Sequence, residues 1–172
     1  MVELREPEAK SGRSTDRRTP LTADPSGSRT ESVMRIDLAE SDEDILACFP
    51  VIRHLRDLED ATTFLQRVRS QQLSGYELAA LRDGGDPVAV AGFRLGESLA
   101  WGRHLYVDDL VTLPEDRSRG HGAALLAWLA ELGRTRGACQ LHLDSGKQRA
   151  DAHRFYEREG LEAAGIHFQH SL

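Results

Sequence analysis

Hydrophobic and polar positions repeat with two different periods between residues 33 and 172, and each change of period marks a predicted element. Alternation with period two predicts strands, and apolar residues spaced three or four apart predict helices. The expected strands are 33–39, 76–83, 87–95, 103–113, 139–144 and 161–172, with a loop over 96–102. The expected helices are 41–55, interrupted or kinked at Pro50, then 60–72, one that follows RSRGHG and ends near 133–137, and 150–160. The predicted order is β-α-α-β-β-β-α-β-α-β, without internal repeats.

Residues 1–32 differ from the rest of the chain because they hold almost no large apolar side chains. They are rich in Ser, Thr, Pro, Arg, Asp and Glu. Such a segment cannot bury enough apolar surface to compensate for the entropy lost on folding. We therefore expect a disordered N-terminal tail over 1–32 and one folded domain over 33–172.

The overall composition is that of a globular chain, with 40% hydrophobic and 29% charged residues. The net charge of −6 argues against a nucleic-acid partner, because nucleic-acid binders present a basic surface. No apolar run is long enough to cross a bilayer, and no signal peptide is recognisable, so we expect no membrane partner and a cytoplasmic location. The histidines and cysteines lack metal-ligand spacing, so no metal is expected.

The stretch RSRGHGAALL, residues 117–126, places two arginines and two glycines directly before an apolar helical run. The first turn of a helix has N–H groups without partners and the positive end of the helix dipole, so it attracts anions. Gly120 and Gly122 leave space for a phosphate, and Arg117 and Arg119 add charge in a geometry that suits it. The sequence therefore predicts a pyrophosphate site; the alternative is a helix-entry turn without a ligand.

Two other kinds of phosphate loop fit the chain less well. A P-loop requires Gly-x-x-x-x-Gly-Lys-Ser/Thr, whereas DSGKQ lacks the first glycine and the final hydroxyl residue. A dinucleotide-binding fold requires Gly-x-Gly-x-x-Gly early in the chain, whereas this Gly-x-Gly lies late and lacks the third glycine. A phosphate-loop kinase or NTPase is therefore disfavoured.

The spacing Arg117-x-x-Gly120-x-Gly122-Ala123 resembles the acyl-CoA pyrophosphate loop of the GCN5-related N-acetyltransferases (GNAT). The resemblance extends over most of 33–172 and includes the strand YVDDLVTLPEDR, the helix GHGAALLAWLAELGRTRG and the later helix AHRFYEREGL. It implies an α+β, three-layer fold with a mixed, mostly antiparallel central sheet flanked by helices. It also implies acetyl-CoA as co-substrate.

The resemblance further implies a CoA site built largely from backbone groups. In the family, the strand before the loop parts from its neighbour, and its freed backbone groups hold the pantetheine arm and the thioester carbonyl. Arg149 stands where the family often has an asparagine, so it either reaches a CoA phosphate or lies in solvent. The expected CoA-binding residues are Leu110, Val111, Thr112, Arg117, Ser118, Arg119, Gly120, His121, Gly122, Ala123, Ser145 and Arg149.

Tyr156 is the expected general acid. Acyl transfer to an amine requires a proton for the departing thiolate and a group that removes a proton from the attacking ammonium. Tyr156 in HRFYERE occupies the position of the tyrosine that resembling enzymes place near the CoA sulfur. Its alternative role is to pack its ring in the core.

Asp108 is the expected base, acting directly or through a water. Strand alternation predicts one face with Tyr106, Asp108, Leu110 and Thr112 and another with Val107, Asp109 and Val111. Asp108 would then point to the reacting carbon, with Asp109 behind it. The alternatives are a carboxylate that only binds the substrate ammonium, or one that pairs with Arg94 or Arg103.

These inferences together predict an N-acetyltransferase that moves an acetyl group from acetyl-CoA to an amino group by direct attack. The alternative is a catalytically silent acyl-CoA-binding module that serves as a regulator or partner subunit. We expect the acceptor pocket between the first two helices, with His54, Glu59 and Phe64, and the last strands, with Phe168 and His170. The acidic balance favours a cationic small-molecule amine or protein amino group, with a polyamine, an aminoglycoside, an amino acid and a protein lysine all open. A homodimer through edge strands is also open.

Overall fold

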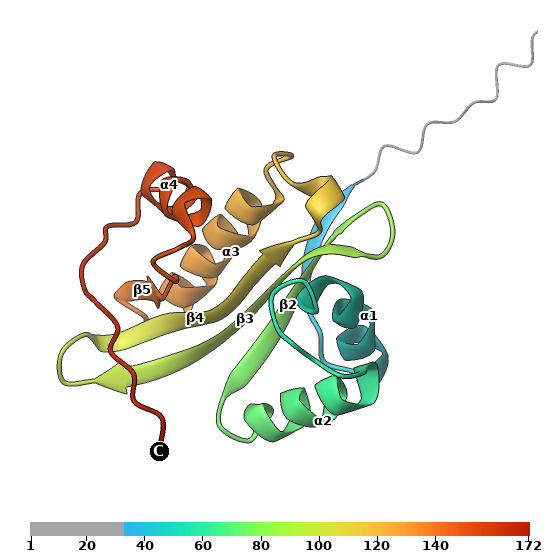
Figure 1. Cartoon of the computed structure of the whole chain (residues 1–172), viewed down its shortest axis with the longest axis horizontal. Coiled ribbons are helices and arrows are strands. Elements are labelled where there is room, and N and C mark those ends of the chain that lie inside the picture. The colour runs from blue at the N-terminus through green and yellow to red at the C-terminus, as the bar shows by residue number, and fades with distance from the viewer. Residues whose placement is uncertain (1–32) are drawn as a thin grey trace, which may run out of the picture. The chain divides into compact units, whose positions relative to one another are not determined.

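The computed structural model describes residues 33–172, which form one five-stranded sheet with helices packed against it (Figure 1). The strands lie in chain order, and only the pair of β4 and β5 is parallel. They are β1 (Met34–Leu38), β2 (Tyr76–Asp83), β3 (Pro87–Ser98), β4 (Gly102–Thr112) and β5 (Gln140–Leu143). The helices are α1 (Asp42–Ile52), α2 (Ala61–Gln72), α3 (His121–Thr135) and α4 (Ala150–Arg158), with a 3-10 turn at Pro114–Asp116. The predicted mixed, mostly antiparallel sheet flanked by helices is confirmed; the tail predicted for 1–32 lies outside the described residues.

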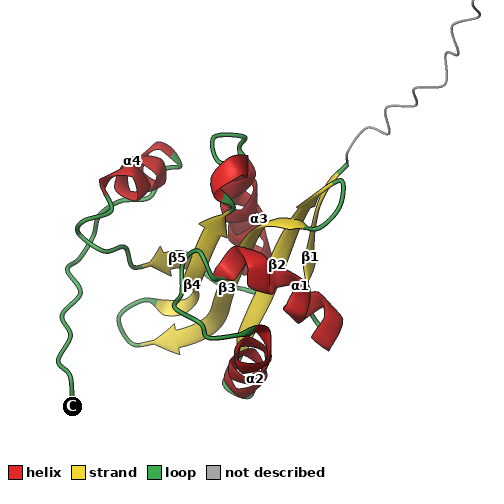
Figure 2. Cartoon of the chain, turned by 45° about the vertical axis from the view of Figure 1, so that its right-hand side comes forward, coloured by secondary structure: helices red, strands yellow, loops and turns green. Residues whose placement is uncertain are grey.

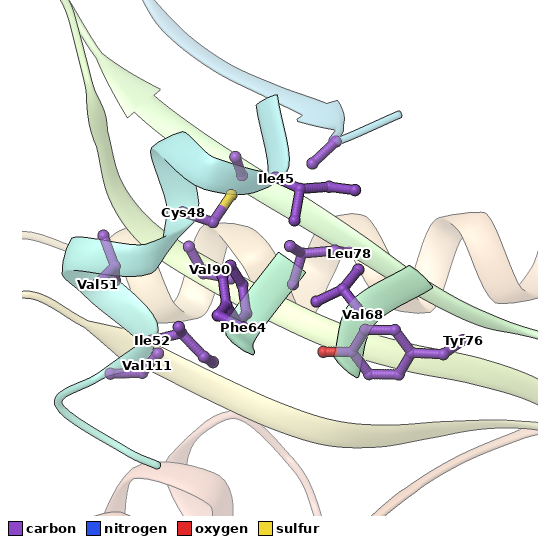
Figure 3. Close-up of a cluster of buried hydrophobic side chains, with 12 residues drawn as sticks. Ile45, Cys48, Val51, Ile52, Phe64, Val68, Tyr76, Leu78, Val90 and Val111 are labelled. Atoms are coloured by element: carbon purple, nitrogen blue, oxygen red, sulfur yellow. The ribbon is translucent and has the colours of Figure 1, made fainter. Parts of the chain in front are cut away.

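Two apolar layers hold the sheet between its helices (Figure 2). On one face, Ile45 of α1 and Phe64 of α2 share a buried cluster with Val90 of β3, as the close-up shows (Figure 3). On the opposite face, Leu125 of α3 shares a second cluster with Phe93 of β3. Side chains that alternate along β3 and β4 therefore enter one layer or the other. No helix in the described part of the chain is both long and apolar enough to cross a membrane.

Side-chain caps define where α1 and α2 begin. The Ser41 hydroxyl accepts a hydrogen bond from the Asp44 N–H at 3.1 Å, and an Asp60 carboxylate oxygen accepts from the Thr63 N–H at 2.7 Å. Each cap satisfies one of the N–H groups that a helix start leaves free. Pro50 does not interrupt α1, which runs through it and ends at Ile52, so the predicted interruption does not occur.

The turn between β3 and β4 is tighter than the loop expected over 96–102. β3 continues to Ser98 and β4 begins at Gly102, and these two residues pair with each other. The Trp101 N–H donates to the Ser98 hydroxyl at 3.2 Å, which holds the short connection closed. The two strands therefore extend into residues 96–102, which were expected to form a loop because of their glycines and polar residues.

The strand expected over 161–172 is wrong. This segment has no regular secondary structure, and β5 pairs only with β4. Ile166 and Phe168, which produce the alternation, are 64% and 87% exposed. A segment with alternating apolar residues forms a strand only when a neighbouring strand pairs with it and its apolar face is buried. The expected placement of Phe168 in an acceptor pocket fails for the same reason.

Candidate active site

A cavity of about 440 Å³ opens where β4 and β5 stop pairing. The parallel ladder ends with Val107 opposite Leu143, and both residues line the cavity. The connection between α1 and α2 contributes His54 to the wall. The predicted site residues that line the cavity are Asp108, Leu110, Arg149 and Tyr156. The structure therefore brings the two predicted catalytic residues to one cavity.

A bulge in β4 takes Asp108 out of strand register. Gly92 of β3 pairs with Asp109, and the next residue, Phe93, pairs with Val107. Asp108 is thus the extra residue on β4, opposite no single residue of β3. A bulge bends the strand and changes the direction of the side chain at that point. Asp108 consequently lines the cavity at the place where β5 leaves β4.

The bulge also shifts the alternation of β4. Val107 packs in the layer of α3, whereas Val111 packs in the layer of α1. Strict alternation would put both on one face, so the prediction of two unbroken faces is wrong. The prediction grouped Tyr106, Asp108, Leu110 and Thr112 on one face. In the structure, Leu110 packs in the α3 layer, whereas Tyr106 lies opposite Arg94, toward α2.

A buried hydrogen-bond network holds the bulge in place. Arg56 donates to an Asp109 carboxylate oxygen from Nε at 2.6 Å and to the Asp108 carbonyl from Nη2 at 2.7 Å. The Tyr76 hydroxyl donates to the other Asp109 carboxylate oxygen at 3.0 Å. Burial, together with the charge of Asp109, raises the pKa of Tyr76 far above its ordinary value, so this hydroxyl remains a donor. Asp109 lies behind Asp108 as expected, and it is 8% exposed.

Gly92 is required opposite this network. A Cβ at residue 92 would lie 1.9 Å from the Tyr76 hydroxyl oxygen and 2.8 Å from an Asp109 carboxylate oxygen. Sequence reasoning missed Arg56, Tyr76 and Gly92 as parts of the site. The adjacent acids within an apolar strand were the only signal, and they did not indicate which residues would pair with them.

Arg94 is the partner of Asp108. Its Nε donates to an Asp108 carboxylate oxygen at 2.9 Å, and its Nη2 donates to Gln71 of α2 at 3.1 Å. Pairing with Arg103 is excluded, because that guanidinium donates to the Arg136 carbonyl at 2.8 Å. One carboxylate oxygen of Asp108 is therefore held from the α2 side of the sheet.

Tyr156 enters the cavity from α4. The side chain is half-buried, and this burial raises the pKa of its hydroxyl, partly opposed by the charge of Arg149. A raised pKa keeps the phenol protonated at neutral pH, since tyrosine ordinarily titrates near about 10. Tyr156 can therefore donate a proton or a hydrogen bond to a group in the cavity.

The start of α3 presents unpaired backbone donors. Gly120 caps the helix with a φ of +87°, a left-handed conformation that glycine adopts without strain. The first N–H with a partner on this turn is that of Ala124, which donates to the Gly120 carbonyl at 2.9 Å. The preceding N–H groups, those of His121, Gly122 and Ala123, have no acceptor within the helix. An anion at this point would satisfy them.

The two arginines of the loop have different surroundings. Arg119 forms ion pairs with Asp116 at 2.5 Å and with Asp83 at 3.1 Å, so its charge is already engaged. Arg117 is exposed and forms no ion pair within residues 33–172. Ser118 between them has a φ of +62° and turns the chain toward the helix. Arg117 therefore has the guanidinium that is available to a ligand.

The remaining predicted CoA contacts lie around this turn or in the core. A Cβ at Gly122 would lie 3.3 Å from the Phe155 ring of α4 and 3.8 Å from the Thr112 hydroxyl, so the first turn of α3 faces a narrow space. The side chain of Val111 and the ring of His121 are buried, which leaves only their backbone groups for a ligand. The Ser145 hydroxyl, just after β5, is buried without a hydrogen-bond partner. Within the described residues, no three His, Cys, Asp or Glu side chains gather to hold a metal.

Comparison with known proteins places this geometry in a family. The acetyltransferase (GNAT) family matches residues 38–161. YhdJ of Bacillus subtilis, an uncharacterized N-acetyltransferase, is 38% identical over 117 residues, 67% of this chain and 82% of the relative. An aminoalkylphosphonate N-acetyltransferase of Salmonella typhimurium is 41% identical over 66 residues, 38% of this chain and 43% of the relative. The structure of aminoglycoside N-acetyltransferase AAC(6')-Iy with CoA has the same fold, with a TM-score of 0.71 at 14% identity over 82% of this chain and 95% of that one.

The Gly92→Ala substitution is expected to lower the free energy of unfolding by about 2–4 kcal/mol, because the new methyl group must displace the Tyr76 hydroxyl from Asp109. Urea denaturation followed by circular dichroism measures the change. Gly85→Ala is the matched control, since a Cβ there meets no atom within 4 Å, and its expected effect is within about 0.5 kcal/mol. Equal losses in the two variants would contradict the proposed role of Gly92.

Proposed function

The chain belongs to the GNAT acetyltransferase family, whose members are acetyl-CoA-dependent N-acetyltransferases, and we propose that it transfers an acetyl group directly to an acceptor amine at the cavity. The observation that carries this proposal is the meeting of Asp108 and Tyr156 in one cavity where β4 and β5 part. The acceptor is a small-molecule amine or a protein amino group. Acetyl-CoA, when bound, supplies the acetyl group as a thioester.

The loop before α3 fits the pyrophosphate of CoA. The N–H groups of His121, Gly122 and Ala123 supply donors, and the helix dipole favours negative charge at this position. Arg117 adds a guanidinium that pairs with no carboxylate among residues 33–172. Gly122 keeps the narrow space beside Phe155 open. We assign the pyrophosphate to this turn, with Arg119 positioned by its own ion pairs to support the loop.

The unpaired part of β4 fits the pantetheine arm and the thioester. From Asp108 onward, no strand of the described residues lies beside β4 on the side of β5. Its backbone groups at Leu110, Val111 and Thr112 can therefore pair with the amides of the arm as a neighbouring strand would. The Ser145 hydroxyl, buried without a partner near the end of β5, supplies a further polar contact, and Arg149 lies beside the cavity for a phosphate or the arm.

Three proton transfers accompany the proposed reaction, and Asp108 and Tyr156 carry them. Asp108 accepts a proton from the acceptor ammonium, directly or through a water, and so frees the nitrogen lone pair. The nitrogen then bonds to the acetyl carbonyl carbon, and the carbon–sulfur bond breaks with its electrons on sulfur. Tyr156 donates its proton to the departing sulfur, and the nitrogen of the new amide gives its second proton to the Tyr156 phenolate, which restores the phenol. The pairing of Asp108 with Arg94 keeps one of its oxygens fixed while the other acts on the acceptor.

Gly122→Trp is expected to abolish CoA binding, because an indole at this position fills the space between the first turn of α3 and Phe155. Acetyl-CoA and CoA should raise the melting temperature of the native protein, since a ligand that binds only the folded state stabilises it by mass action. ATP and NAD serve as comparison ligands.

Gly85→Trp, in the open turn between β2 and β3, is the control and should keep the shift. Absence of any shift with acetyl-CoA and CoA in the native protein would contradict the pyrophosphate assignment.

Tyr156→Phe is expected to lower kcat about 10²- to 10⁴-fold without weakening acetyl-CoA binding, because only proton donation is lost. Burial raises the pKa of Tyr156, so the acid form persists at neutral pH, and kcat of the native enzyme should show no fall between about pH 7 and 9.5 from its deprotonation. Steady-state rates with an acceptor found in an amine screen measure both effects.

His153→Gln, on the same helix, is the matched control and should leave turnover unchanged. Unchanged turnover in a double variant with Tyr156→Phe and Asp108→Asn would contradict the mechanism. Binding of acetyl-CoA without acetylation of any amine would favour a regulatory module instead.

A further inference from the structure

We propose that a cluster of three aromatic side chains beside the cavity, Trp101, His104 and His142, binds the ring of a ring-bearing acceptor amine. This proposal rests on the proposed function, because it assigns a substrate class to the same site. The cluster lies at the outer end of the β3–β4 hairpin and on β5. Nothing in the transfer chemistry derived above uses these residues.

The cluster presents a flat face to solvent. The Trp101 ring stacks on the His142 ring with a centroid distance of 4.0 Å and an angle of 20°. The His104 ring meets the Trp101 ring edge-on at 5.3 Å and the His142 ring edge-on at 5.7 Å. Trp101 is 43% exposed even though one of its faces is covered by His142. The other face of the indole is therefore free to stack on a ligand.

The rings beneath the indole are held in fixed positions. His104 is 8% exposed, and its Nδ1 lies 3.0 Å from the Gly102 carbonyl. The Nε2 of His142 lies 2.8 Å from the side-chain oxygen of Gln140. Burial, with His104 nearby, lowers the pKa of His142, which keeps its imidazole neutral at neutral pH. A support that is already fixed in position loses little entropy when a ring stacks on it.

The cluster is continuous with the cavity along β5. His142 of β5 pairs with Tyr106 of β4, and Asp144 follows β5 and contacts the same tyrosine. Asp144 lines the cavity, where it accepts hydrogen bonds from the Tyr106 hydroxyl at 2.5 Å and lies 3.0 Å from Nδ1 of His167. The cluster therefore adjoins the cavity through Tyr106 and Asp144.

The surroundings favour a cationic amine with a ring over other occupants. The carboxylates of Asp108 and Asp144 line the cavity together with Arg56 and Arg149, and each carboxylate is a possible partner for an ammonium. α1 and α2 pack over β2, β3 and β4 and do not extend over β5, as the arrangement in Figure 1 illustrates. An indole face binds an aromatic ring or the hydrogen-bearing face of a sugar ring equally well by shape. A purely aliphatic amine would use the carboxylates but not the indole.

Fluorescence of Trp101 tests the contact without requiring turnover. The chain has two tryptophans, and Trp128→Phe leaves Trp101 as the only indole. The CoA-saturated protein is titrated with 2-phenylethylamine, glucosamine and butylamine. We expect a saturable change in emission with at least one ring amine at a concentration at least tenfold below that needed for butylamine. Which ring amine responds distinguishes an aromatic from a sugar substrate. No response to either ring amine, or an equal response to butylamine, overturns the proposal.

Steady-state kinetics provide the second test. For a ring-bearing acceptor, Trp101→Ala should raise KM at least tenfold with kcat and CoA affinity unchanged, and Trp101→Phe should restore most of the loss. Leu99→Ala is the matched control, because Leu99 is fully exposed on the same turn outside the ring cluster. An unchanged KM in Trp101→Ala overturns the proposal. The proposal is also overturned if Trp101→Ala converts a dimer to a monomer while ring amines still bind.

The two proposals fail in different ways. Loss of CoA binding or absence of all amine acetylation in the native protein contradicts the proposed function. A missing Trp101 response in an enzyme that does acetylate amines contradicts only the ring site. A Trp101 response to ring amines in a protein without turnover supports the ring site and contradicts the enzymatic reaction.

Discussion

The ion pair between Arg56 and Asp109 is the interaction on which the rest of this site depends. It ties the connection between α1 and α2 to the middle of β4, and the same guanidinium holds the carbonyl of the bulged residue Asp108. A buried carboxylate is costly unless its oxygens are satisfied. Here Arg56 satisfies one oxygen and Tyr76 the other, while the arginine keeps about half of its side chain in water. The desolvation cost therefore falls mainly on Asp109.

This network converts an ordinary antiparallel strand into one that can serve two neighbours. Up to Val107, β4 pairs with β5 and its apolar side chains support α3. After the bulge, β4 no longer pairs with β5, and the side chain of Val111 packs on the other face of the sheet. The change occurs at the residue whose carboxylate lines the cavity. Structural support and proposed chemistry thus meet at one irregularity of the backbone.

Local sequence was sufficient for the features that depend on local chemistry. The glycines and arginines before α3 predicted a helix start with free donors, and the structure has Gly120 as a left-handed cap. The order of the elements as far as α4 and the position of Tyr156 on that helix also followed from short-range patterns. Each of these depends on residues within a few positions of one another, where spacing carries the information.

The predictions that were wrong, and the features that were missed, concern residues whose partners are distant in the sequence. The bulge at Asp108 is held by Arg56 and Tyr76, which lie 52 and 32 positions earlier in the sequence. The alternation of apolar and polar residues along β4 does not indicate these partners. The expected final strand had the right alternation, but a strand is defined by the neighbour that pairs with it. The cluster of Trp101, His104 and His142 was not predicted, because its rings come from a turn and two strands and meet only in the folded chain.

The parting of β4 and β5 has a consequence for solubility. Within the described residues, β5 is the last strand of the sheet, so from Asp108 onward β4 presents an edge whose backbone N–H and C=O groups have no neighbouring strand. Open strand backbone is a template for pairing with another chain and a common start of aggregation. In the proposed function, the amides of CoA take the place of that missing strand. The co-substrate would then protect the folded chain from self-association as well as supply the acetyl group, and the ligand-free protein would be the aggregation-prone form.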